Sequence, residues 1–153
     1  KGVNGAWDAG LVVVVAAGNN GPRTMSITTP GISRKVITVG CSDDDREVLV
    51  GGNRMVDYSG RGPTAACICK PDLVAPGCSV VSCAGRADKY TIKSGTSMST
   101  PIVSGATALL LERYPDMTNK DVKLKLRESC TDIGLPRNQQ GWGLLDVEKL
   151  VSK

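Results

Sequence analysis

The stretch that decides the fold class is residues 11–17, which read LVVVVAA between Gly10 and Gly18. A continuous run of β-branched residues of this length is typical of a strand buried on both faces, as in a parallel sheet. The flanking glycines are expected to end the strand, because glycine is unfavourable inside a regular element. We therefore predict a buried parallel strand at this point in the chain.

The segments around this strand indicate a mixture of short strands and helices. Further strands are predicted at residues 36–39, 55–59, 79–83 and 90–93, each bounded by glycine or proline. Helices are predicted at residues 3–9, at 101–114, after a capping box at Thr118, and after Asp146. Together these elements predict an α/β fold with a mostly parallel sheet and flanking helices, in one domain over residues 1–153.

The composition excludes several classes of function. The 153 residues contain no histidine, so the chain cannot complete a Ser-His-Asp triad or ligate zinc through imidazole. The net charge of +4 comes from intermixed charges without a basic, aromatic-rich stripe, which argues against nucleic-acid binding. No apolar run approaches the length of a membrane span, so we expect no membrane partner.

Six cysteines leave the redox state of the chain open. We favour free, mostly buried thiols over structural disulfides or a metal site, because the C-x-C pair at Cys67 and Cys69 lacks a second pair or a histidine. Free thiols lean slightly towards a reducing environment, and localisation is otherwise open. The first residues, KGVN, show neither an initiator methionine nor a signal-peptide layout, so we expect a piece of a longer chain.

Residues 94–101 (SGTSMSTP) form the first segment that could carry chemistry. Small residues crowd a transition from strand to helix, and Thr96 or Ser97 stands where a helix N-cap belongs. A serine at such a point has an exposed hydroxyl and a backbone N–H aimed out of the helix, an arrangement that suits attack on a carbonyl. The alternative is an ordinary Ser/Thr-rich helix cap.

The second segment is residues 16–22 (AAGNNGP), directly after the apolar strand. Ligands of α/β sheets bind beyond the carboxyl ends of the strands, and an asparagine there can donate its side-chain N–H to a developing negative charge. The alternative is a simple turn, because Gly-Asn and Asn-Gly are common turn dipeptides.

Taken in order, the motifs AAGN, APG (residues 75–77) and SGTSM-STP resemble the subtilisin-like serine proteases, or subtilases, of the bacterial AprX type. Supporting stretches lie at residues 26–40, 58–63, 70–77 and 141–146. The resemblance runs over essentially the whole chain. It implies a subtilisin-like fold and places this chain in the C-terminal portion of a catalytic domain.

The resemblance also implies roles for individual residues. Ser97 would be the nucleophile, and Asn19 would donate to the oxyanion together with the backbone N–H of Ser97. The expected substrate-binding residues are Ala16, Ala17, Gly18, Gly31 and Thr96.

Family members carry their triad in the order Asp, His, Ser. A segment with the serine alone is therefore expected to follow a missing half that holds the aspartate and the histidine. The predicted function is that of a serine endopeptidase, with this chain inactive by itself. The alternative is a non-catalytic relative that binds peptides or regulates a partner. Expected partners are a protein or peptide substrate, the N-terminal half of the domain and, through exposed strand edges, further copies of the chain.

The acidic residues raise one question about metals. The resemblance makes Asp72 a weak candidate for binding a monovalent cation or calcium, and it allows structural calcium or sodium in the full domain, although no cofactor is required. One carboxylate is thin evidence for calcium, which prefers six to eight oxygens, and hydrogen bonding to nearby backbone is the alternative. Residues 43–45 (DDD) are predicted to form a solvated loop.

Overall fold

The structure is a computed structural model that describes residues 2–85 and 89–152. In chain order its elements are α1 (Gly2–Asp8), β1 (Val14–Ala16), β2 (Ile37–Cys41), β3 (Val48–Val50), β4 (Asn53–Met55), β5 (Leu73–Ala75), β6 (Val80–Cys83), β7 (Tyr90–Lys93), α2 (Thr96–Arg113), α3 (Asn119–Ser129), α4 (Arg137–Gln140) and α5 (Val147–Val151). The α/β class predicted from the sequence is confirmed.

A three-stranded parallel sheet lies at the centre, in the order β1-β2-β5. Val14 pairs with Ile37, and Val39 pairs with Leu73. The outer edge of β5 is covered by the segment around Leu144, which bridges to the strand in parallel. Within the described residues no strand pairs with the outer edge of β1.

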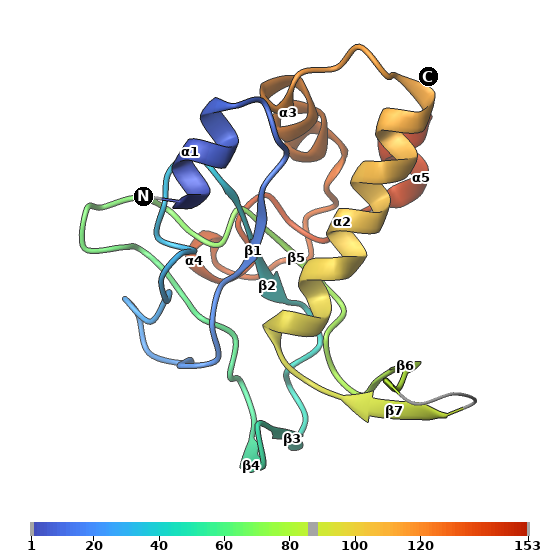
Figure 1. The fold of residues 1–153 in the computed structure, drawn as a ribbon. Helices are drawn as coiled ribbons and strands as arrows, with labels where there is room; N and C mark the ends of the chain where they lie inside the picture. Colours follow the sequence, from blue (N-terminus) through green and yellow to red (C-terminus); the bar gives the residue numbers. More distant parts are fainter. Residues whose placement is uncertain (1, 86–88, 153) are drawn as a thin grey trace.

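One main core lies between the sheet and the helices. In Figure 1, α2 runs along the sheet with α5 beside it, and α3 crosses near one end. The buried members of this core are Trp7, Ile37, Val39, Leu73, Ala75, Val103, Ala106, Leu110, Val122, Leu126 and Leu150. Burial of these apolar side chains, at roughly 1.5–3 kcal/mol for each large one, holds α2 against the strands.

Three predictions about local structure need correction. β1 is shorter than the apolar run and only half-buried, because it lies at the edge of the sheet. The strand expected at residues 55–59 is found at Asn53–Met55, in a hairpin with β3. Helix α2 begins at Thr96 rather than at Pro101, and its N-cap residue is Gly95, with a φ of 138° that favours glycine.

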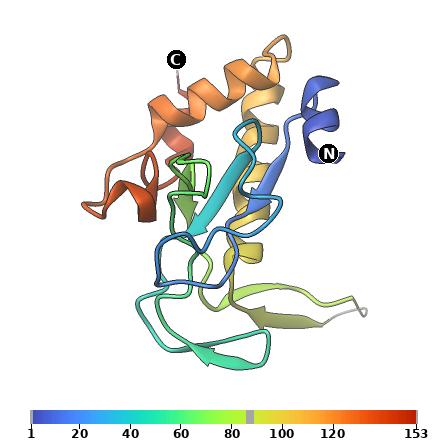
Figure 2. The ribbon, with the colours of Figure 1, turned by 90° about the vertical axis from the view of Figure 1, so that its left-hand side faces the viewer.

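The strands end at the side of the molecule from which both hairpins, β3-β4 and β6-β7, extend, and α2 begins at that same side (Figure 2). The two candidate segments of the sequence therefore lie at one end of the sheet. Among the described residues, no helix has the length and apolar character needed to span a membrane.

Candidate active site

Thr96 joins the two candidate segments. Its backbone N–H and its hydroxyl both donate to Oδ1 of Asn19, each over 3.0 Å. The same hydroxyl accepts from the backbone N–H of Gly18 over 3.2 Å. Because the Thr96 side chain is fully buried, these contacts hold residues 77 positions apart in one fixed arrangement.

This arrangement fixes the orientation of the Asn19 amide. Its oxygen accepts from Thr96 on two sides, so the nitrogen Nδ2 points away from Thr96 as a donor. No described residue accepts a hydrogen bond from Nδ2, and the Asn19 side chain is half-buried. The protein thus presents a side-chain N–H donor beside the beginning of α2.

Ser97 is the second residue of α2 and is exposed. Of its neighbours, Thr96 donates its N–H to Asn19, and Met98 donates its N–H to the carbonyl of Gly95 over 2.8 Å. The N–H of Ser97 between them has no acceptor among the described residues. A free N–H at a helix N-terminus, where the helix dipole favours negative charge, is suited to an oxyanion.

The turn at residues 75–77 supports this helix start from below. The carbonyl of Gly77 accepts from the Gly95 N–H over 2.9 Å, and the Ser99 hydroxyl donates to the Ala75 carbonyl over 2.9 Å. A Cβ atom on Gly77 would lie 2.9 Å from the sulfur of Cys41 and would overlap the Ser99 hydroxyl. Only glycine fits between these groups, so the APG motif is explained by packing beneath the candidate nucleophile.

The residues expected to bind substrate divide into two groups. Ala16 and Gly18 are half-buried at the end of β1 and are accessible. Ala17, Gly31 and Thr96 are buried, and their part in substrate binding stays a prediction. Thr96 positions Asn19, and Gly31 packs beneath β1, where an added Cβ would lie 2.9 Å from the Ala16 carbonyl.

Asp72 lies in a buried ionic cluster. Its Oδ2 accepts from the backbone N–H of Thr38 over 2.7 Å and from the ammonium of Lys70 over 2.5 Å. The Lys70 side chain is 1% exposed and also donates to the Val36 carbonyl over 3.0 Å. A second ammonium, that of Lys123, lies 3.7 Å from Oδ1.

These contacts do not fit a metal ion at Asp72. Lys123 donates to the carbonyls of Arg34, Lys35 and Val36 over 2.9–3.0 Å, so the two ammonium groups use the oxygens that calcium would need. A further cation beside two ammonium groups would be repelled. A backbone N–H does bond Asp72, but it is that of Thr38, 34 positions away in the chain, and not the local backbone that the sequence suggested.

The burial of Lys123 leads us to expect that the free energy of unfolding depends on pH. Burial, only partly offset by Asp72, lowers the pKa of Lys123 from 10.5 to about 8. Between these values the unfolded chain holds a proton on Lys123 that the folded chain lacks, so stability rises with pH. We expect the difference in free energy of unfolding between wild type and Lys123→Met to grow in favour of wild type from pH 8 to 10.5. Urea unfolding over this range measures it, and a constant difference would contradict the assigned burial.

The predicted solvated loop at residues 43–45 is wrong for two of its three residues. Asp44 is 4% exposed and accepts from the Ser59 N–H over 2.7 Å, and its burial raises the pKa of the carboxyl. Asp43 accepts from the N–H groups of Gly77 and Cys78. Only Asp45 is exposed. A run of three carboxylates gives no sign of which ones the chain will bury.

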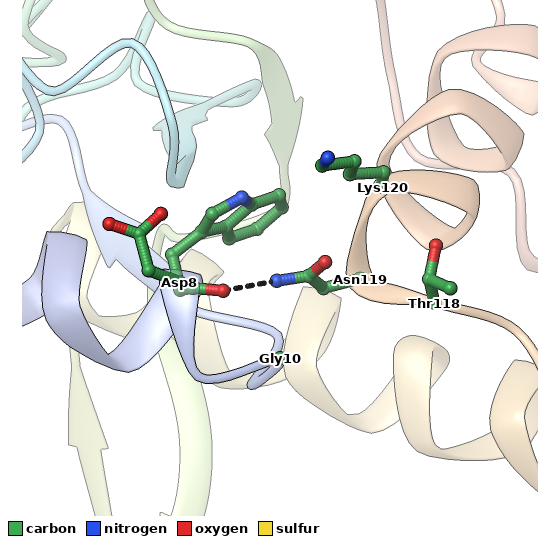
Figure 3. A pocket seen from close by; sticks show the side chains of 6 residues that line it. Asp8, Gly10, Thr118, Asn119 and Lys120 are labelled. Carbon is green, nitrogen blue, oxygen red and sulfur yellow. Dashed lines mark hydrogen bonds between the residues drawn. The ribbon is translucent and has the colours of Figure 1, made fainter.

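A pocket at α1 and α3 lies away from the candidate active site. A cavity of ≈ 450 Å³ lies between α1 and the start of α3, lined by Asp8 and Lys120 among others (Figure 3). The amide of Asn119 donates there to the Trp7 carbonyl over 2.7 Å. That bond ties α3 to α1, so Asn119 has a structural role remote from Ser97.

The subtilase family profile matches residues 1–143. The chain is 41% identical over 145 residues to serine protease AprX of Bacillus subtilis (strain 168), covering 86% of this chain and 33% of that protein. It is 35% identical over 150 residues to subtilisin DY of Bacillus licheniformis, covering 97% of this chain and 49% of that one. The chain thus spans between a third and a half of these relatives.

Solved structures agree. A mutant of the protease domain of PatA superimposes with a TM-score of 0.73 at 28% identity, covering 97% of this chain and 50% of that one. The prenylagaramide maturation protease PagA gives a TM-score of 0.73 at 24% identity, covering 95% of this chain and 51% of that one, and supports the fold. The order of motifs, the parallel sheet and these matches lead to one conclusion: the chain belongs to the subtilase family of serine proteases.

Proposed function

We propose that this chain carries the nucleophile and the oxyanion site of a serine endopeptidase, with Ser97 as the nucleophile. The observation that carries this proposal is the Thr96 bridge, which orients the Asn19 amide beside the free N–H of Ser97. Two donors next to an exposed serine hydroxyl are the arrangement that acyl transfer requires.

The proposed reaction begins with attack of the Ser97 hydroxyl oxygen on a peptide carbonyl carbon. Because the chain has no histidine, the base that takes the hydroxyl proton must come from sequence outside it, oriented by an aspartate. Asn19 Nδ2 and the Ser97 N–H stabilise the oxyanion of the tetrahedral intermediate. The leaving amine receives the proton, and water then hydrolyses the acyl-enzyme and restores the serine.

The expected substrates are proteins or peptides, in keeping with the proteases to which the chain is similar. Half-buried Ala16 and Gly18 at the end of β1 offer a wall without large side chains, against which a substrate residue can lie. The preference for particular substrate side chains would be set jointly by this wall and by residues outside the chain.

A fluorophosphonate probe tests the proposal. The protein with a complete catalytic domain is expected to react rapidly and to carry the label on Ser97, located by peptide mass spectrometry. The 153-residue chain alone is expected to react slowly, since no base activates the hydroxyl. Rapid labelling of a different serine would contradict the assignment of Ser97. No labelling of the complete domain would favour a non-catalytic, peptide-binding relative.

Thr96→Val tests the positioning of Asn19. The valine keeps the shape but loses the hydroxyl that joins Gly18 to Asn19, so we expect kcat to fall by about 10-fold while KM changes little. Thr96→Ser restores a hydroxyl and is expected to recover most of the rate. Steady-state kinetics on a peptide substrate measure both, and equal losses in the two variants would point to packing instead.

A further inference from the structure

A second, smaller core lies beneath the candidate active site. It contains the buried side chains of Cys41, Val50 and Tyr58, with half-buried Cys78 packed against them. Cys41 ends β2 and Cys78 follows the APG turn, so parallel pairing of β2 with β5 brings the two thiols to the same end of the sheet. The expectation that the six cysteines are mostly buried is wrong, because Cys67, Cys69 and Cys83 are exposed, Cys78 and Cys130 are half-buried, and Cys41 alone is buried.

The side chains in this core converge on one point. The sulfurs of Cys41 and Cys78 and a carboxylate oxygen of Asp43 all lie within 4.8 Å of one another. In residues 2–85 and 89–152 this is the one group of three such side chains with that spacing. Two sulfurs bound to one Zn²⁺ at about 2.3 Å lie about 3.8 Å apart in a tetrahedron, so movements of about 1 Å or less close the site.

The carboxylate of this group is already held in place. Oδ1 of Asp43 accepts from the N–H of Gly77 over 2.7 Å and from the N–H of Cys78 over 3.1 Å. It also accepts from the thiol of Cys41 over 3.1 Å. The other oxygen, Oδ2, has no donor among the described residues and remains able to bind a cation.

Tyr58 supplies the surrounding shell. Its phenol oxygen lies 3.2 Å from the Cys41 sulfur and 3.3 Å from the Cys78 sulfur, and the whole side chain is buried. The phenol O–H also has the Gly77 carbonyl as an acceptor over 3.3 Å and can donate to that oxygen or to one sulfur. Hydrogen bonds from such a donor to ligand atoms orient the ligands of a metal site and stabilise their charge. Two thiols, a fixed carboxylate and a buried phenol form a donor set that suits a thiophilic cation better than calcium.

We propose that Cys41, Asp43 and Cys78 bind one Zn²⁺ ion, with water in the fourth position. On binding, the ion replaces the thiol protons of both cysteines: two S–H bonds break, two Zn–S bonds form, and two protons pass to solvent, without oxidation or reduction. Because binding releases two protons, it is expected to strengthen as pH rises.

The position of the site gives it a consequence. Gly77, whose N–H is held by Asp43, accepts from the N–H of Gly95, the N-cap residue of the helix that carries Ser97. Zn²⁺ bound at Asp43 and Cys78 cross-links the end of β2 to the turn beneath that helix. The bound ion is expected to raise the unfolding temperature of the protein and to steady the helix start.

The experiment uses the complete protein with Cys67, Cys69 and Cys83 replaced by serine, which removes the exposed thiols that would bind metal elsewhere. Under reducing conditions, Zn²⁺ is titrated by calorimetry, and Co²⁺ is titrated to detect thiolate-to-cobalt charge-transfer absorption. One equivalent is expected to bind, with two thiolates in the cobalt spectrum and a higher unfolding temperature with Zn²⁺.

Three variants in this background decide the outcome. Cys78→Ser and Asp43→Asn are expected to lose binding, and the asparagine keeps an oxygen to accept from the two backbone N–H groups. Cys130→Ser is the matched control, since Cys130 is also a half-buried thiol but lies outside the group, and it is expected to bind as before. If Cys78→Ser unfolds, Cys78→Ala takes its place, with circular dichroism as the check of folding.

Two results would overturn the proposal. The first is the absence of saturable binding of Zn²⁺ and Co²⁺ by the folded, reduced protein. The second is binding that survives in a folded Cys78 variant with an unchanged cobalt spectrum. Neither result depends on Ser97, so the failure of this proposal and that of the proposed protease function are distinguishable.

Discussion

Ser97→Ala is expected to lower kcat of the complete protease by about 10⁶-fold, the scale measured for loss of the nucleophile in subtilisin itself. The substitution removes only the hydroxyl group of a side chain that is exposed in the first turn of α2. The loss therefore reflects chemistry and not folding. Hydrolysis of a chromogenic peptide at saturating substrate measures it.

A matched control lies two residues further along. The Ser99 hydroxyl is buried and donates to the Ala75 carbonyl, so Ser99→Ala removes a structural hydrogen bond but no proposed catalytic group. It is expected to cost about 1 kcal/mol of stability and to leave most of kcat intact. A Ser97→Ala enzyme that keeps a tenth of its activity would rule Ser97 out as the nucleophile.

Asp72→Asn is expected to lower the free energy of unfolding by about 3–5 kcal/mol, the usual cost of breaking a buried ion pair by removing one partner. The variant leaves the Lys70 ammonium in a site where its side chain is 1% exposed, with the Val36 carbonyl as its other acceptor. Burial already lowers the pKa of Lys70. Chemical denaturation at pH 7 measures the change.

Two comparisons separate the effect of burial from the effect of charge. The double variant Lys70→Met with Asp72→Asn removes the stranded ammonium and is expected to recover much of the loss. Asp8→Asn breaks the ion pair with Lys35, which is exposed, and is expected to cost 1 kcal/mol at most, by the usual scale of about 0–1 kcal/mol. If Asp72→Asn lowers the free energy of unfolding no more than Asp8→Asn does, the buried ionic cluster at Asp72 does not stabilise the fold to the extent that its burial implies.

Local signals predicted much of the fold. The capping box is present as expected, with Thr118 accepting from the Asp121 N–H, and Asp146 caps the last helix. The strands at residues 79–83 and 90–93 are found within one residue of the predicted bounds. These features depend on neighbours in the sequence, so the sequence is enough to find them.

The features that the sequence could not predict depend on distant segments. The strand predicted at residues 55–59 ends at Met55, and Tyr58 is instead buried with its phenol oxygen against the Cys41 sulfur and the Gly77 carbonyl. From the sequence, Lys70 is a charged residue in a loop. Nothing in its neighbouring residues indicates that its ammonium group donates to the Val36 carbonyl and to the Asp72 carboxylate.

The candidate active site contains both kinds of feature, those that could be predicted from the sequence and those that depend on distant segments. The order of motifs predicted Ser97 and Asn19 as candidates, and their roles stay predictions. The hydrogen bonds of Thr96 to Asn19 were not predicted, because Thr96 was expected only as a substrate-binding residue. A signal was available: a threonine at a helix start, near an asparagine that follows a strand at the same end of the sheet, has a hydroxyl that can join a backbone N–H to the asparagine side chain.

The buried hydroxyl of Thr96 has a mechanical consequence for turnover. Because it ties Gly18 and Asn19 to the first residue of α2, we expect Ser97 and the Asn19 amide to move together and not as separate parts. In their proposed roles, these groups would present an arriving peptide with a site that is already assembled.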